Sequence, residues 1–286
     1  MIKRTLHTVV AAVSTLLCLQ ASADQSNDEE KSLQNWAVYY ADKAKIADFD
    51  AYGMLVLDSV YHPNIAQLIE QDKQLLGYLS LGEVEQHRHY FEEVKKEGLL
   101  LQENQYWKGS FMVDVRNPKW TKRVVEDLIP EILRQGFQGL FIDTLDNPPH
   151  LEQTNPSKFA GMGMAAANLI KAIRLNYPHI PLMVNRGYPI LPDICNDIDM
   201  VLGESVYAQY DFDKKTYRLV EEKLYRQQVK ILTDLKKCNP KLKIYSLDYW
   251  NPEDTKGIAK IYKEQQRNGF YPYVATITLD QLVPRP

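Results

Sequence analysis

Residues 139–143 read GLFID, a short apolar run of strand-forming residues that ends on an aspartate. Seven further runs of this kind lie between Trp36 and Thr278, and six of the eight end on, or within one residue of, a carboxylate. In chain order the runs end at Asp42, Asp58, Glu83, Asp143, Asn185 with Arg186, Glu204, Asp248 and Thr276. This pattern predicts an α/β fold, a (β/α)8 TIM barrel, in which the C-terminal ends of all strands meet around one pocket.

The first 23 residues have the pattern of a signal peptide. Lys3 and Arg4 precede an apolar stretch over residues 9–19, and residues 21–23 (ASA) follow as a cleavage pattern. The apolar stretch is too short for a membrane helix, which needs about 20 residues. We therefore expect cleavage after Ala23, a secreted or periplasmic protein, and no stable membrane span.

The remainder of the chain is interpreted as a short leader and one domain. Residues 24–34 (DQSNDEEKSLQ) are polar and charged, which is typical of a flexible segment. No linker rich in Gly, Ser or Pro interrupts residues 35–286. The formal net charge is −3, and no basic cluster suggests a nucleic-acid surface. We expect a monomeric, single-domain protein that binds no nucleic acid and needs no cofactor.

Helical patterns fill four of the gaps between the predicted strands. The clearest runs from Asn117 to Gly136, where a capping residue is followed by proline, and a kink is expected at Pro130. Residues 110–115 (SFMVDV) alternate like a strand but would be a ninth, so we assign them to an excursion between the third and fourth strands. The other helices are expected over residues 156–176, 214–237 and 252–268.

Two cysteines remain after removal of the signal peptide. Cys195 precedes the sixth predicted strand and Cys238 precedes the seventh, so both are expected near the N-terminal rim of adjacent strands. Thiols in an oxidising compartment can pair. We predict a structural disulfide between them, and the alternative is two separately buried thiols.

Six segments of the chain resemble one known family. In chain order they read YLSLGEVE (78–85), DVRNPKW (114–120), GFQGLFIDTLD (136–146), GES (203–205), DY (248–249) and GFYPYV (269–274). Together they resemble the endo-α-1,4-polygalactosaminidase family, glycoside hydrolase family 114, over almost the whole mature chain. The resemblance implies a TIM barrel that hydrolyses exported polysaccharide containing galactosamine or N-acetylgalactosamine.

Glycosidic cleavage typically uses two carboxyl groups, one to protonate the leaving oxygen and one to attack or stabilise the anomeric carbon. Asp143 and Glu204, after the fourth and sixth predicted strands, fit this requirement. By similarity to related barrel hydrolases, we assign Asp143 as the nucleophile and Glu204 as the general acid/base. The alternative is that these strand-end acids cap helices or pair with Arg116 or Arg186.

Further residues at or just beyond the strand ends are candidates for substrate binding. A group of acids at one face is costly unless the acids bind, hydrogen-bond or exchange protons with something. Sugar hydroxyls, or the ammonium of a deacetylated galactosamine, are suitable partners, and aromatic rings can stack on a sugar face. The candidates are Asp42, Asp58, Tyr78, Glu83, Asp146, Asn185, Arg186, Tyr207, Asp248 and Tyr249.

Two other functions remain open beside a polysaccharide hydrolase. The barrel could bind carbohydrate without cleaving it. His87 and His89, just after Glu83, could instead hold zinc or iron in a metal-dependent hydrolase or deacetylase. We expect no metal site, because HxH pairs are common in solvated loops and no third histidine follows a strand.

Overall fold

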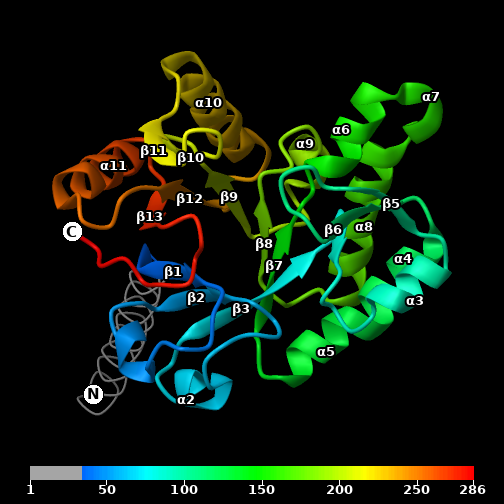
Figure 1. Cartoon of the computed structure of the whole chain (residues 1–286), viewed down its shortest axis with the longest axis horizontal. Helices are drawn as coiled ribbons and strands as arrows, with labels where there is room; N and C mark the ends of the chain where they lie inside the picture. The colour runs from blue at the N-terminus through cyan, green and yellow to red at the C-terminus, as the bar shows by residue number, and fades with distance from the viewer. Residues whose placement is uncertain (1–33) are drawn as a thin grey trace, which may run out of the picture.

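The computed structural model describes residues 34–286, and its centre is a sheet of eight parallel strands with helices outside it (Figure 1). The sheet order is β1-β2-β3-β7-β8-β9-β12-β13. The strands are β1 (Trp36–Tyr39), β2 (Met54–Leu57), β3 (Gln74–Ser80), β7 (Gly139–Asp143), β8 (Leu182–Asn185), β9 (Met200–Glu204), β12 (Lys243–Tyr249) and β13 (Tyr271–Ala275). The predicted TIM barrel is confirmed.

The two outer strands of this order, β1 and β13, lie against each other and nearly close the barrel. The Trp36 indole N–H donates to the Tyr271 carbonyl at 3.0 Å. The Trp36 ring also packs edge-to-face on Tyr245 of β12, with ring centroids 5.3 Å apart. Strands that are covered on both faces must be apolar throughout, which is why they are visible in the sequence as continuous hydrophobic runs rather than as alternating patterns.

The helices differ from the predicted ones in three places. The predicted helix 117–136 contains a π-helical segment, η2 (Val124–Leu128), which ends two residues before Pro130, whose missing N–H interrupts the regular hydrogen-bond ladder. The predicted helix 156–176 is divided at Gly161, whose φ is +82°. The helices are η1 (Ile46–Phe49), α2 (Ile65–Ile69), α3 (Phe91–Lys96), α4 (Pro118–Arg123), η2 (Val124–Leu128), α5 (Ile129–Arg134), α6 (Asn147–Thr154), α7 (Pro156–Phe159), α8 (Met162–Asn176), α9 (Leu191–Ile194), α10 (Glu222–Cys238) and α11 (Thr255–Arg267).

The third difference concerns one of two excursions from the barrel. The predicted start of a helix at residue 214 is wrong, because β10 (Ala208–Asp211) and β11 (Thr216–Leu219) form an antiparallel hairpin there. The predicted excursion between the third and fourth barrel strands is present. Its strand belongs to a three-stranded antiparallel sheet of β4 (Glu83–Glu85), β6 (Ser110–Val113) and β5 (Leu100–Glu103). Both excursions leave from C-terminal ends of barrel strands, so they rise beside the expected pocket.

The predicted disulfide is present. It joins Cys195, directly after α9, to Cys238 at the end of α10, with the Cα atoms 6.3 Å apart. Within residues 34–286 no helix is long and apolar enough to cross a membrane. The predicted signal peptide and nearly all of the predicted leader lie outside the described residues.

Candidate active site

A cavity of about 1210 Å³ lies at the C-terminal ends of the barrel strands. Its lining contains nine of the twelve residues that the sequence indicates as catalytic or substrate-binding candidates. These nine are Asp58, Tyr78, Glu83, Asp143, Asp146, Asn185, Arg186, Glu204 and Tyr249. They come from strands or strand ends far apart in sequence, and the barrel brings them together as expected from its topology.

Asp143 and Glu204 are held as a pair by a single amide. The Asn185 Nδ2 donates to Asp143 Oδ1 at 2.9 Å and to Glu204 Oε2 at 2.7 Å. These two oxygens are therefore separated by no more than the sum of the two distances, which is below the separation of about 6.5 to 9.5 Å found in inverting glycosidases.

Each carboxyl group of the pair also accepts a hydrogen bond from a tyrosine. Tyr78 of β3 donates to Asp143 Oδ2 at 3.0 Å, and Tyr249 of β12 donates to Glu204 Oε1 at 2.6 Å. Burial, together with the nearby carboxylates, raises the pKa of both tyrosines well above the usual value. Both hydroxyls therefore remain neutral donors across the physiological range.

The surroundings of Asp143 make it bind a proton more readily than an ordinary aspartate does. Burial, followed by the negative charge of Glu204, raises the pKa of Asp143 to about 6, although hydrogen bonds from Asn185 and Tyr78 act in the opposite direction. Desolvation and a like charge both disfavour an ionised carboxyl group. Asp143 is therefore protonated at a higher pH than an ordinary aspartate.

The backbone turns sharply directly after Asp143, Asn185 and Glu204. Thr144, Arg186 and Ser205 follow the strand-end residues of β7, β8 and β9, and their φ angles are +66°, +51° and +54°. Positive φ is costly for a residue with a Cβ, on the order of 1–3 kcal/mol, and such strain is concentrated at functional sites. The Thr144 hydroxyl offsets part of this cost by contacting Ser80 Oγ at 2.9 Å and accepting from Gly82 N at 2.7 Å.

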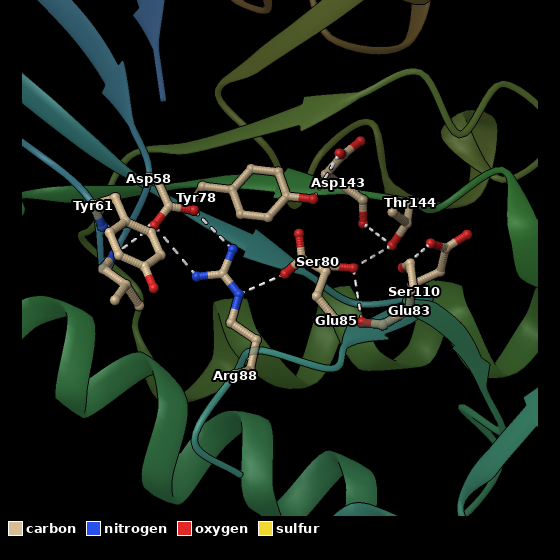
Figure 2. Close-up of polar contacts among 11 residues, drawn as sticks. Asp58, Tyr61, Tyr78, Ser80, Glu83, Glu85, Arg88, Ser110, Asp143 and Thr144 are labelled. Atoms are coloured by element: carbon tan, nitrogen blue, oxygen red, sulfur yellow. Dashed lines mark hydrogen bonds and ion pairs between the residues drawn. The ribbon is translucent and has the colours of Figure 1, made fainter. Parts of the chain in front are cut away.

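A buried arginine that the sequence analysis did not identify contacts the ring of Tyr78, the tyrosine that donates to Asp143. Arg88, which is 7% exposed, donates to Asp58 Oδ2 at 2.7 Å and to Glu85 Oε2 at 2.5 Å. Figure 2 shows its guanidinium between the two carboxylates and near the Tyr78 ring, whose hydroxyl points toward Asp143. The ion-pair network therefore supports the tyrosine that contacts Asp143.

Burial alone would raise the pKa of Asp58, but the charge and hydrogen bonds of Arg88 lower it overall. Asp58 thus acts as a charged partner within the wall of the cavity. Its other contacts are the backbone N–H groups of Val60 and Tyr61, at 2.7 and 2.9 Å. These contacts hold the loop that follows β2.

Glu83 is a buried carboxylate in the same wall with three side-chain donors. The Asn104 and Asn147 amides donate to Glu83 Oε1 at 2.6 and 2.5 Å, and the Ser110 hydroxyl donates to the other oxygen. Both asparagines line the cavity and were missed by the sequence analysis. They follow no strand-end pattern, since one lies on the excursion after β5 and the other begins α6.

Asp146 and Arg186 form an ion pair at the cavity wall, with Arg186 Nε 2.7 Å from Asp146 Oδ2. Asp146 also accepts from the backbone N–H of Gly187 at 3.0 Å. The alternative that strand-end acids pair with Arg186 therefore applies to Asp146 rather than to Asp143 or Glu204. The other arginine of that alternative, Arg116, pairs with Asp114 at 2.7 Å.

Three sequence candidates do not line the cavity. Asp42 is exposed and lies three residues beyond the end of β1. Asp248 is fully buried, and its oxygens accept from the backbone N–H groups of Tyr207 and Ala208 and from the Gln265 amide. Tyr207 packs edge-to-face on Tyr225 of α10 instead. Asp248 and Tyr207 therefore contact the scaffold, and none of the three residues lines the cavity.

The two histidines considered as a metal pair do not lie together in the cavity. His87 lines it, whereas His89 contacts Glu131 of α5 at 3.4 Å. Over residues 34–286 no group of three His, Cys, Asp or Glu side chains is arranged to hold a metal ion. The arrangement of the cavity is instead that of two adjacent carboxyl groups with fixed hydrogen-bond donors.

Comparisons with known proteins agree with this geometry. Residues 18–286 match glycoside hydrolase family GH114. The structure is similar to the glycoside hydrolase domain of PelA from Pseudomonas aeruginosa, at 26% sequence identity and a TM-score of 0.76, over 87% of this chain and 96% of that chain. It is also similar to Aspergillus fumigatus Ega3, solved in complex with galactosamine, at 13% identity and a TM-score of 0.64, over 89% of this chain and 96% of that chain. An uncharacterised protein of Deinococcus radiodurans is 24% identical over 225 residues, which are 74% of this chain and 67% of that protein.

Proposed function

Since the chain belongs to glycoside hydrolase family GH114, we propose that it is an endo-acting hydrolase of exported polysaccharide that contains galactosamine or N-acetylgalactosamine. The family membership confirms the prediction of a glycoside hydrolase. The galactosamine bound to Ega3 supports the choice of amino sugar. The signal-peptide pattern supports action outside the cytoplasm.

The amide of Asn185 that bridges Asp143 and Glu204 is the observation that carries the mechanism. A short distance between two carboxyl groups, about 5 to 5.5 Å, is typical of retaining glycosidases. In this mechanism the Asp143 carboxylate attacks the anomeric carbon while Glu204 gives its proton to the departing oxygen. Glu204 then takes a proton from the water that attacks the glycosyl-enzyme ester and releases Asp143.

A raised pKa is usual for a general acid, whereas a carboxyl group that acts as a nucleophile must be ionised. At pH 7 a carboxyl group with a pKa of about 6 is mostly ionised, as attack requires, and it is more fully ionised when Glu204 holds the catalytic proton and bears no charge. The hydrogen bonds from Asn185 and Tyr78 stabilise the anion. Asp143 at the end of β7 is therefore suited to act as a nucleophile, and it loses this ability when it binds a proton in mildly acidic solution.

The cavity favours a positively charged substrate. Carboxylates outnumber the two cationic side chains of its lining, Lys108 and Arg186, even when the buried Arg88, which pairs with two of the carboxylates, is counted. Low-dielectric walls concentrate the field of such charges and attract a cation. We expect a deacetylated galactosamine unit, which carries an ammonium, to be preferred over an acetylated one. The six lining carboxylates are Asp58, Glu83, Glu85, Asp143, Asp146 and Glu204.

The experiment that tests the function is hydrolysis of defined polymers by the purified protein. Polymers of galactosamine, N-acetylgalactosamine and glucosamine would be compared by the appearance of reducing ends and by product length. Galactosamine polymer should be cleaved to products of mixed length, because an endo-acting enzyme cuts within the chain. Release of monomer alone would contradict endo action, and no cleavage of any galactosamine-containing polymer would overturn the proposed function.

The activity should fall in mildly acidic solution, at a pH above the value of about 4 near which an ordinary aspartate binds its proton. Burial still raises the pKa of Asp143 when Glu204 holds the catalytic proton, so Asp143 binds a proton and can no longer attack at a pH where an ordinary aspartate would still be ionised. The measurement is the pH profile of kcat/KM, which reports ionisations of the free enzyme. Tyr78→Phe removes a hydrogen bond that stabilises the anion and should move the acid limb to higher pH. An acid limb centred near pH 4 in the native enzyme would refute this prediction.

A further inference from the structure

Two excursions of the chain meet at the mouth of the cavity through an aromatic contact. Trp107 lies in the turn between β5 and β6, and Phe212 directly follows β10. Their ring centroids are 5.7 Å apart, and the ring planes are inclined at 84°. Both residues line the same cavity as Asp143 and Glu204, although neither belongs to a barrel strand.

The turn that carries Trp107 is fixed to the cavity wall. The Asn104 Oδ1 accepts from the backbone N–H groups of Tyr106 and Trp107 at 2.9 and 3.2 Å. The same side chain donates to Glu83 at 2.6 Å. A residue held in this way loses little conformational freedom when a ligand binds.

The hairpin that carries Phe212 is supported by a second aromatic contact. The Tyr210 ring lies 5.3 Å from Phe212 and 5.2 Å from Tyr217 on the opposite strand. Asp211 accepts from the backbone N–H of Lys214 at 3.0 Å, which stabilises the turn. Phe212 is therefore presented from an ordered hairpin.

Both rings remain substantially open to solvent, at 54% for Trp107 and 46% for Phe212. An apolar ring in water gains free energy when a ligand covers it. Their mutual contact is edge-to-face, which uses one ring face and leaves others available for stacking. The cavity of about 1210 Å³ exceeds the range of about 300 to 1,000 Å³ that is typical for small ligands, so it can hold more than one sugar unit.

We propose that Trp107 and Phe212 form a sugar-binding subsite for units of the polysaccharide beyond those at the cleaved bond. This inference rests on the proposed function and adds to it the residues that hold the chain at a distance from the two carboxyl groups. The C–H face of a sugar ring stacks on the indole, and the two excursions define where the polymer enters the cavity. The enzyme therefore prefers long chains to short ones.

The test compares long and short substrates with the variants Trp107→Ala and Phe212→Ala. The Kd of galactosamine polymer is measured on the Asp143→Asn background, and kcat/KM is measured on the polymer and on p-nitrophenyl α-galactosaminide. Each variant should weaken polymer binding about twofold to tenfold, because an aromatic contact contributes about 0.5 to 1.5 kcal/mol. The loss of kcat/KM should be larger for the polymer than for the short substrate, and Trp107→Phe should retain most of the binding.

Tyr106→Ala is the matched control. Tyr106 is the neighbouring aromatic residue, is 68% exposed and does not line the cavity. The subsite would be overturned if Trp107→Ala and Phe212→Ala weakened polymer binding no more than Tyr106→Ala does. Equal losses of kcat/KM on the polymer and on the short substrate would also overturn it. Failure of the unmodified protein to bind or cleave any galactosamine polymer would instead overturn the proposed function, and the subsite with it.

Discussion

Asp143→Asn and Glu204→Gln are each expected to lower the turnover of galactosamine polymer at least about a hundredfold, the lower end of what acid/base catalysis contributes. Each change keeps the shape of the side chain but removes the ionisable group. The bridging amide of Asn185 still finds an oxygen acceptor on both variants. The measurement is kcat on the polymer, with unfolding followed in parallel to establish that the fold is intact.

Asp143→Asn should not reduce stability at neutral pH. Because burial and Glu204 raise the pKa of Asp143 in the folded state, its ionised form destabilises the fold above the pKa of the unfolded chain. The uncharged amide removes this penalty, so the variant should unfold at a temperature equal to or above that of the native protein. A large fall in unfolding temperature would show that lost activity results from lost structure.

The roles of the two carboxyl groups can be separated. Added azide can replace a missing nucleophile in Asp143→Gly and should give a glycosyl azide whose anomeric configuration identifies the attacked face. Asp42→Asn is the matched control, because this exposed strand-end acid lies outside the cavity. If both amide variants hydrolyse the polymer at near the native rate, the assignment of the catalytic pair is wrong.

Arg88→Met is expected to lower the free energy of unfolding by about 3 to 5 kcal/mol. The change removes the cation from between Asp58 and Glu85 and leaves two carboxylates in the cavity wall without it. The measurement is urea or thermal unfolding at pH 7. Arg226→Met is the control, because Arg226 pairs with Glu222 on an exposed face of α10 and should contribute less than about 1 kcal/mol.

The unpaired charges can be removed to test this cause. If they destabilise Arg88→Met, then adding Asp58→Asn and Glu85→Gln should recover part of the lost stability. Arg88 keeps the pKa of Asp58 in the folded protein below its usual range. The stability that this ion pair contributes is therefore fully present above the pKa that Asp58 has in the unfolded chain, and it is lost as the pH falls through the pKa of Asp58 in the folded protein. Equal losses for Arg88→Met and Arg226→Met would show that the buried network does not carry this stability.

The sequence alone was sufficient for the barrel and for the location of the candidate pair. Strands buried on both faces must be apolar, so GLFID and the other barrel strands are visible as hydrophobic runs. Parallel strands in a barrel end at one face, so Asp143, Asn185 and Glu204 had to lie close together whatever the helices did. The resemblance of the same segments to glycoside hydrolase family 114 was confirmed by the family match.

Only the tertiary structure decided which strand-end acids line the cavity. Asp42 and Asp248 share the sequence pattern of Asp143, but one is exposed and the other caps backbone N–H groups in the core. Their orientation depends on where each strand stops and on which loop packs over it. Neither the end of a strand nor the loop that packs over it can be obtained from the hydrophobic pattern, because both depend on contacts that are distant in sequence.

The excursions show the same limit. Residues 110–115 were expected to form a strand, yet the partners of that strand and the position of Trp107 above the cavity follow from packing against β4 and β5. The second strand of the hairpin that carries Phe212, β11, lies within the predicted helix 214–237, because a short run of mixed apolar and charged residues does not distinguish a strand from a helix. Local sequence determined the barrel strands because burial constrains every residue in them, whereas the mouth of the cavity is built by loops whose direction only long-range contacts decide.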